Sequence, residues 1–120
     1  MVERSEGGGF YVVGQADGVQ VRFAVDTGAS DIVLSPDDAH RIGVDPSTLK
    51  FSAPSETANG VGYGAPIVVK SLTVGPIRLT NVPVTVNQAP MSASLLGASF
   101  LRRLSSFEIR GDQLFLSDGG

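Results

Sequence analysis

The sequence contains no cysteine, no tryptophan and a single histidine among its 120 residues. The absence of cysteine excludes a thiol nucleophile, a zinc finger and an iron–sulfur cluster. The one histidine, His40, lies late in a short predicted helix, where a solvated side chain is much commoner than a catalytic one. Serine or metal chemistry that needs histidine is therefore disfavoured, and we expect neither a metal nor a cofactor.

Basic charge and long apolar runs are also scarce. Nine lysines and arginines face 12 acids, and they are scattered apart from the pair Arg102-Arg103, so we expect no nucleic-acid partner. No run approaches the roughly 20 apolar residues that cross a bilayer, and residues 1–9 lack the apolar centre of a signal peptide. We expect a soluble chain in which residues 1–9 are a flexible leader, either native or a cloning remnant, with any membrane tether outside it.

The abundant residues are those of short strands and turns, with 15 valines, 15 glycines and 7 prolines. Valine packs well on a pleated sheet, while glycine and proline punctuate strands. Ser35 and Pro36 indicate the start of a helix that ends at Gly43, and a second short helix is predicted over 98–104. Residues 10–120 are predicted to form one mainly β domain, a barrel or a sandwich, with strands at 10–16, 19–26, 31–34, 49–56, 63–74, 77–79, 82–86, 95–97, 107–110 and 114–116.

One apolar strand ends directly in Asp26, which is followed by Thr27-Gly28. Gly28 allows a tight turn whose amide can approach the Asp26 carboxylate, and the Thr27 hydroxyl can bond the backbone of a symmetric partner. Two such carboxylates held side by side share one proton, because they cannot both ionise. A pair of this kind can activate water for attack on a peptide carbonyl and then protonate the leaving amine.

Asp-Thr-Gly is also an ordinary turn, and it arises by chance in roughly one in forty chains of this length. Two features make it informative here. The first is its flanking sequence, which is apolar before the motif and Ala-Ser after it. The second is the segment Leu95-Leu96-Gly97, which stands just before the second predicted helix. The other acids have simpler explanations. Asp37 and Asp38 suit the first turn of a helix, and Asp17 and Asp112 suit hairpin turns.

Three segments together resemble the retropepsin-like aspartic proteases. Their active-site loop is similar to Asp26-Thr27-Gly28-Ala29-Ser30, and their flap is similar to the hairpin around 59–64. Their apolar-apolar-glycine segment is similar to Leu95-Leu96-Gly97. The resemblance spans about residues 10–116, and the stretch 96–101 is most similar to bacterial single-lobe members. It implies a mainly β, closed single-lobe barrel with two short helices and the activity of an aspartic endopeptidase.

The resemblance also implies roles for individual residues. Asp26 would be the catalytic acid, Thr27 the interlocking threonine, and Ala29 part of the active-site loop. Leu95, Leu96 and Gly97 would pass behind that loop and support it. Contacts with substrate would come from Gly28, Ser30, Asp31, Asn59, Gly60, Val61 and Tyr63. For Tyr63, a flap aromatic over substrate and ordinary cross-strand packing are equally consistent with the sequence.

A single Asp-Thr-Gly implies a homodimer, because each protomer then supplies one aspartate across a two-fold axis. The partners implied are a second copy and a peptide or protein substrate, and the bacterial resemblance implies a periplasmic domain tethered to the inner membrane. The chain departs from retroviral members by having Ala98-Ser99 in place of an arginine after Gly97, and by a different flap tip.

Two other hypotheses stay open at the level of sequence. The first is a catalytically silent dimer of the same fold that binds peptides or partner proteins and keeps its acid for structural reasons. The second is a β-rich interaction module in which Asp-Thr-Gly is a chance turn, and this one predicts a monomer. Cleavage that depends on Asp26 separates the protease from both.

Overall fold

The computed structural model describes residues 2–3, 10–57, 60–104, 106–110 and 113–117, with side chains described for 10–54 and 62–104. Within them lie ten strands, two short α-helices and one 3-10 turn. In chain order these are β1 (Val2–Glu3), β2 (Phe10–Ala16), β3 (Val19–Val25), β4 (Val33–Leu34), α1 (Pro36–Arg41), η1 (Pro46–Thr48), β5 (Ala53–Thr57), β6 (Gly60–Val74), β7 (Ile77–Asn87), β8 (Ser94–Leu96), α2 (Ala98–Leu101), β9 (Ser106–Arg110) and β10 (Gln113–Ser117).

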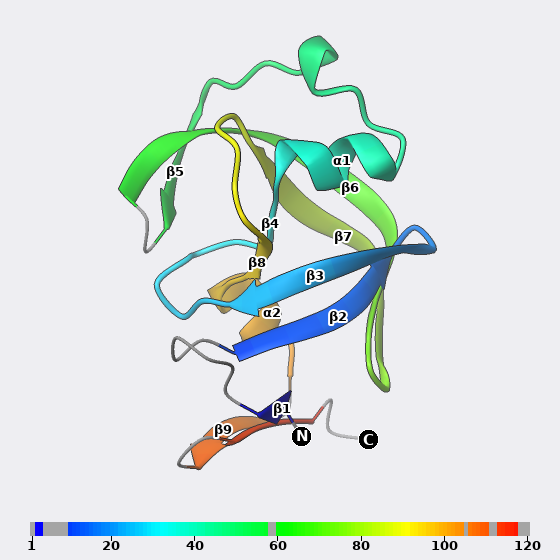
Figure 1. Ribbon diagram of the computed structural model, residues 1–120, viewed down its shortest axis with the longest axis vertical. Helices are drawn as coiled ribbons and strands as arrows, with labels where there is room; N and C mark the ends of the chain where they lie inside the picture. The colour runs from blue at the N-terminus through cyan, green and yellow to red at the C-terminus, as the bar shows by residue number, and fades with distance from the viewer. Residues whose placement is uncertain (1, 4–9, 58–59, 105, 111–112, 118–120) are drawn as a thin grey trace.

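The main sheet closes on itself as a barrel (Figure 1). Its strands follow the order β2-β3-β8-β4-β7-β6, and a further pairing of β2 with β6 completes the ring of six. β5 stands outside the ring and pairs with the first part of β6. The predicted mainly β, closed barrel with two short helices is confirmed.

Alternating side chains place the core inside this ring. On β3, Val21 and Phe23 are fully buried, while Gln20 and Arg22 face outward, the alternation typical of a strand with one face in the core. From α2 and the residues after it, Phe100, Leu101 and Leu104 add buried side chains to this core. The largest fully buried side chains of the described residues are Phe23, Phe100, Ile32, Leu34, Leu72, Ile77 and Leu96.

The barrel closes tightly at Gly14, where β2 meets β6. A Cβ at this position would lie 2.6 Å from the Thr73 carbonyl oxygen, too close for any real contact. We expect Gly14→Ala to lower the free energy of unfolding by about 2 kcal/mol, because the two strands must separate to admit a methyl group. Chemical denaturation checks this, with Gly62→Ala as control, because the nearest atom of the described side chains is there the Asn87 oxygen at 3.9 Å. Equal stability of the two variants would contradict the prediction.

Both α1 and η1 begin with a capping side chain followed by a proline. Ser35 caps α1 by accepting the Asp38 N–H at 3.1 Å, with Pro36 in the first turn, as predicted. Asp45 caps η1, which was not predicted, by accepting hydrogen bonds from the Ser47 hydroxyl and amide. These bonds lower the pKa of the exposed Asp45 carboxyl, because they favour its ionised form.

Several element boundaries differ from the predicted ones. β7 runs unbroken through Asn81, which adopts a φ of 52°, because its ladder with β6 continues on both sides. The strands predicted at 77–79 and 82–86 are therefore one strand, and β6 begins at Gly60 rather than at Tyr63. β4 covers 33–34 rather than 31–34, β5 covers 53–57 rather than 49–56, and α2 ends at Leu101 rather than at residue 104.

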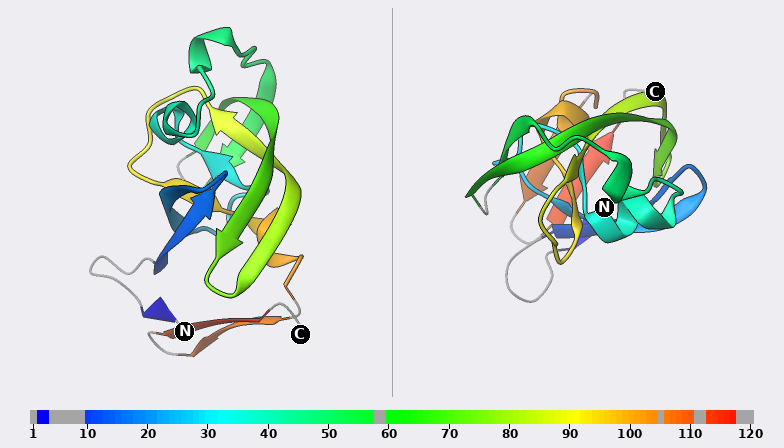
Figure 2. Two further views of the ribbon diagram at one scale, coloured as in Figure 1. Left: turned by 90° about the vertical axis from the view of Figure 1, so that its right-hand side faces the viewer. Right: turned by 90° about the horizontal axis from the view of Figure 1, so that it is seen from above.

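A smaller sheet lies at one end of the barrel, next to β2 and α2 (Figures 1 and 2). Its strand order is β1-β10-β9, and Val2 pairs with Leu114. Val2 and Glu3, which belong to the predicted flexible leader, thus pair with β10, and residues 4–9 of that leader lie outside the described ones. Across the described ranges, no helix has the length and apolar character needed to cross a bilayer.

Candidate active site

Asp26 follows the last residue of β3, and its backbone and side chain are both fixed. Its N–H donates to the Leu96 carbonyl at 3.1 Å, and its own carbonyl accepts the Ala29 N–H at 3.1 Å. The Gly28 N–H donates to Asp26 Oδ1 at 2.9 Å, which is the approach of amide to carboxylate that the sequence predicted. The carboxylate is therefore oriented by its own turn in a partly exposed position.

The segment 96–99 holds the loop that follows Asp26. The Ala98 N–H donates to the Ala29 carbonyl at 2.8 Å, and the Ser99 N–H to the Ser30 carbonyl at 2.9 Å. The Ser99 hydroxyl in turn accepts the Ile32 N–H at 3.2 Å. Ser99 was not among the predicted site residues, although it stands in the stretch that follows Gly97. Its position two residues after Gly97 was the one sequence signal that could have indicated a role in supporting the loop.

Gly97 is the point of closest approach between this segment and the loop. A Cβ at Gly97 would lie 2.2 Å from the Asp31 carbonyl oxygen and 2.6 Å from the Ala29 carbonyl oxygen. Both atoms belong to the backbone, so neither can move aside alone. Any residue with a Cβ would push the loop away, which gives the glycine of the Leu95-Leu96-Gly97 segment a steric reason.

The two leucines of that segment face opposite sides of the sheet. Leu96 is fully buried in the main core, whereas Leu95 packs with Ala29 and Val33 in a separate small cluster. Ala24 and the partly buried Met91 contact this cluster from its edge. Leu95 pairs with Ala24 on one side and with Val33 on the other, so β8 lies between the strands that enter and leave the loop.

The exposed rim of the loop is formed by Thr27, Gly28, Ser30 and Asp31. The Thr85 hydroxyl donates to Asp31 Oδ2 at 3.3 Å, which ties the end of the loop to β7. Thr27 lines a shallow concavity of about 280 Å³ together with Ala98, Leu101 and Arg102. Asp31 lines a different groove of about 370 Å³, whose other walls come from β6, β7 and the residues near α2.

The β5–β6 hairpin projects on the side of the barrel where the loop after Asp26 lies (Figure 1). Tyr63 pairs with Pro54, its side chain is 55% exposed, and its carbonyl accepts the Gln88 N–H at 3.0 Å. Gly60 and Val61 belong to β6, where the structure describes only their backbone, and Asn59 lies outside the described residues altogether.

The chemical group that the site offers is the carboxylate of Asp26. Asp26 can accept a proton from water when ionised and can donate one when protonated, and a second carboxylate is needed to perform both tasks at once. In the part of the chain that the structure describes, no three histidine, aspartate or glutamate side chains gather closely enough to hold a metal ion.

Comparison with known proteins agrees with this geometry. The family described as “gag-polyprotein putative aspartyl protease” matches residues 12–103. Two curated relatives are each 38% identical over 98% of the chain: an uncharacterised protein from the cobV 5′ region of a Sinorhizobium species and an uncharacterised protein of Rickettsia prowazekii. The chain spans about half the length of these relatives, 51% and 50%.

Two solved structures are similar over most of the chain. The crystal structure of a retropepsin-like aspartic protease from Rickettsia conorii is 36% identical, with a TM-score of 0.82 over 96% of this chain and 85% of that one. The retroviral protease-like domain of Ddi1 from Leishmania major is 20% identical, with a TM-score of 0.55 over 88% and 86%, and it shows the fold alone. With its family match, its fold and the geometry around Asp26, this chain belongs to the retropepsin-like aspartic proteases.

Proposed function

We propose that the chain is one protomer of a homodimeric aspartic endopeptidase. The observation that carries this proposal is the Asp26 carboxylate, which the Gly28 N–H holds at 2.9 Å in a partly exposed position at the end of a barrel strand. The Leu96 carbonyl and the segment 97–99 fix the surrounding loop. A carboxylate fixed in this way is suited to proton transfer, since little reorganisation is needed during the reaction.

In the proposed mechanism, the Asp26 residues of two protomers share one proton across the two-fold axis. The ionised carboxylate takes a proton from water while the water oxygen bonds to the peptide carbonyl carbon. The protonated carboxyl gives its proton to the carbonyl oxygen, which yields a neutral diol. A proton then passes from the protonated carboxyl to the amide nitrogen, while the ionised carboxylate takes a proton from one diol hydroxyl. The carbon–nitrogen bond breaks, a carboxylic acid and an amine are released, and the pair again shares one proton.

Substrate would lie extended over the loop and beneath the β5–β6 hairpins. The exposed rim of Gly28, Ser30 and Asp31 offers backbone and carboxylate groups for a bound peptide. The apolar cluster of Ala29, Val33 and Leu95 underlies that rim. The exposed Tyr63 lies on the hairpin and would contribute to covering the substrate. Thr27, on the loop surface, would face the partner protomer.

Incubation with a mixed peptide library between about pH 4 and pH 7 tests this function, because a shared-proton carboxylate pair operates in that range. Mass spectrometry should find new peptide ends with the wild-type protein and none with Asp26→Asn. The silent-dimer hypothesis predicts peptides that are bound but intact. Intact peptides with dimeric wild-type protein at every pH would contradict the protease.

We also propose a periplasmic location with a tether to the inner membrane outside this chain. Resemblance to bacterial single-lobe members supports this proposal. Fractionation of the native host, with an antibody to this domain, tests it: the domain should be released from the periplasmic side by protease treatment of spheroplasts. Protection in intact spheroplasts would place the domain in the cytoplasm.

A further inference from the structure

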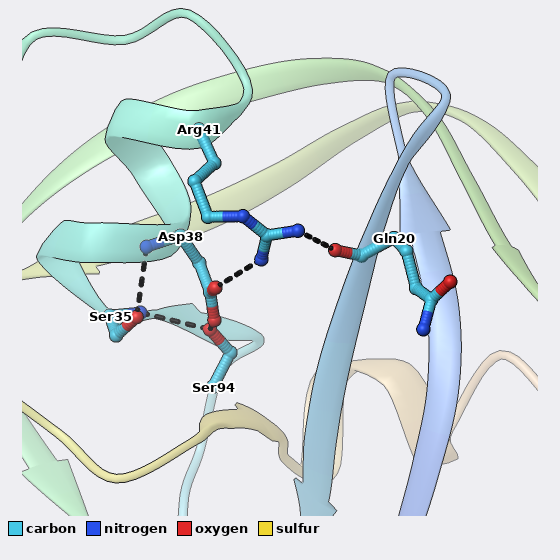
Figure 3. A network of polar contacts seen from close by, with 5 residues as sticks. All are labelled: Gln20, Ser35, Asp38, Arg41 and Ser94. Atoms are coloured by element: carbon cyan, nitrogen blue, oxygen red, sulfur yellow. Dashed lines mark hydrogen bonds and ion pairs between the residues drawn. The ribbon is translucent and has the colours of Figure 1, made fainter.

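A polar network joins α1 to the strands around Asp26 (Figure 3). At its centre is Ser94, the first residue of β8, whose side chain is fully buried. The Ser94 hydroxyl accepts the Ser35 N–H at 2.9 Å and donates to Asp38 Oδ2 at 2.6 Å. Because an amide only donates and an ionised carboxylate only accepts, the hydroxyl proton has a single orientation.

The outer part of the network reaches β3, the strand that leads to Asp26. Arg41 Nη1 donates to Asp38 Oδ1 at 2.9 Å, and Arg41 Nη2 donates to the Gln20 carbonyl at 2.7 Å. The Arg41 side chain is 50% exposed, so its ion pair adds little stability. The Asp38 side chain is only 15% exposed, and its short bond with Ser94 is charge-assisted, which makes that bond the stronger part of the network.

β8 needs this bond because its own sequence specifies its register weakly. All three of its residues are buried, so no alternation of polar and apolar side chains selects one register. A shift by one residue would turn the Ser94 hydroxyl away from Asp38. It would also leave the Ser35 N–H without its acceptor in a buried position, and such a loss is costly.

The register of β8 determines what Asp26 contacts. Val25 pairs with Leu96, and the Leu96 carbonyl accepts the Asp26 N–H at 3.1 Å. The next residue, Gly97, is the one that fits against the loop carbonyls. We propose that Asp38 and Ser94 are positioning residues for Asp26: their buried hydrogen bond sets the register of β8 and thereby the placement of the catalytic carboxylate. This inference rests on the proposed function.

The test removes the bond from either side. Ser94→Ala and Asp38→Ala should each lower kcat by about 10- to 100-fold with KM within about twofold, because a displaced catalytic group loses rate rather than binding. Asp38→Asn should stay within about threefold of the wild type, since its amide oxygen can still accept the Ser94 hydroxyl. Asp37→Asn changes an exposed acid of the same helix turn and is the matched control.

Amide hydrogen exchange supplies a measurement that does not depend on cleavage. In Ser94→Ala and Asp38→Ala, the Asp26 and Ala98 amides should exchange at least about 10-fold faster, because their acceptors lie in the segments that β8 positions. Amides of the β6–β7 ladder, such as that of Val69, should keep wild-type protection. A uniform increase in exchange at both places would indicate only general destabilisation and would overturn the proposal.

The proposal is also overturned if both alanine variants retain the wild-type kcat and the wild-type exchange rate at Asp26. Asp38→Ala keeps the test decisive should Ser94→Ala fail to fold, because the Asp38 side chain reaches the surface. If the wild type shows no cleavage that depends on Asp26, the proposed function fails on its own. The exchange rates then decide the positioning role: faster local exchange supports it, and unchanged exchange refutes it.

Discussion

Asp26→Asn should lower kcat/KM for peptide cleavage by at least about 10³-fold, because the acid–base pair is lost. Asparagine has nearly the same shape, and its amide oxygen can still accept the Gly28 N–H that Asp26 Oδ1 accepts at 2.9 Å. It cannot take a proton from water, so the attacking oxygen is not activated. Steady-state kinetics on a cleaved library peptide measures this loss.

Folding of the Asp26→Asn variant has to be shown separately. Its circular dichroism and melting temperature should match the wild type closely, since the residue is partly exposed and the turn geometry is retained. Asp37→Asn provides a control with the same chemical change in the first turn of α1. Cleavage by Asp26→Asn within about tenfold of the wild type would exclude Asp26 as the catalytic acid.

Gly97→Ala should cost about 3 kcal/mol or more of stability and remove activity at the same time. The new methyl group would lie 2.2 Å from the Asp31 carbonyl oxygen and 2.6 Å from that of Ala29. Relief requires the loop to move away, which breaks the 2.8 Å hydrogen bond from the Ala98 N–H to the Ala29 carbonyl. Urea denaturation and kcat/KM measured on the same preparation check both parts.

Gly62→Ala is the control for this substitution as well, because among the described side chains the one that a Cβ there would meet is Asn87, whose oxygen lies at 3.9 Å. It should change the free energy of unfolding by less than about 1 kcal/mol, and toward higher stability, since alanine is favoured over glycine within a strand. If Gly97→Ala is as stable as Gly62→Ala and cleaves peptides normally, the contact between Gly97 and the loop does not support the site.

Features set by neighbouring residues were predictable from the sequence. The β2–β3 hairpin follows from alternation and from Asp17-Gly18, both of which adopt positive φ. The Gly28 N–H to Asp26 bond spans two residues, so the Thr-Gly turn was enough to indicate it. The unbroken β7 was missed because Asn81 looks like a strand end, and only its ladder with β6 carries the strand through.

The supports of the site could not be predicted in the same way, because their partners lie far apart in the chain. Ser99 and Ile32 are 67 residues apart, and Ser94 and Asp38 are 56 apart. Serine and aspartate at such positions have many local explanations, and Asp38 was in fact interpreted as a helix-capping acid. Its carboxylate instead joins α1 to β8, and only the folded barrel brings the two together.

A subunit-mixing experiment tests most directly whether each chain supplies half of an active site. Wild-type and Asp26→Asn protomers are mixed in varying ratios at constant total concentration and allowed to exchange. If each site needs one Asp26 from each protomer, activity falls with the square of the wild-type fraction, and an equal mixture keeps about one quarter of the rate. If an equal mixture keeps about one half, each protomer carries a complete site and the dimeric mechanism is wrong.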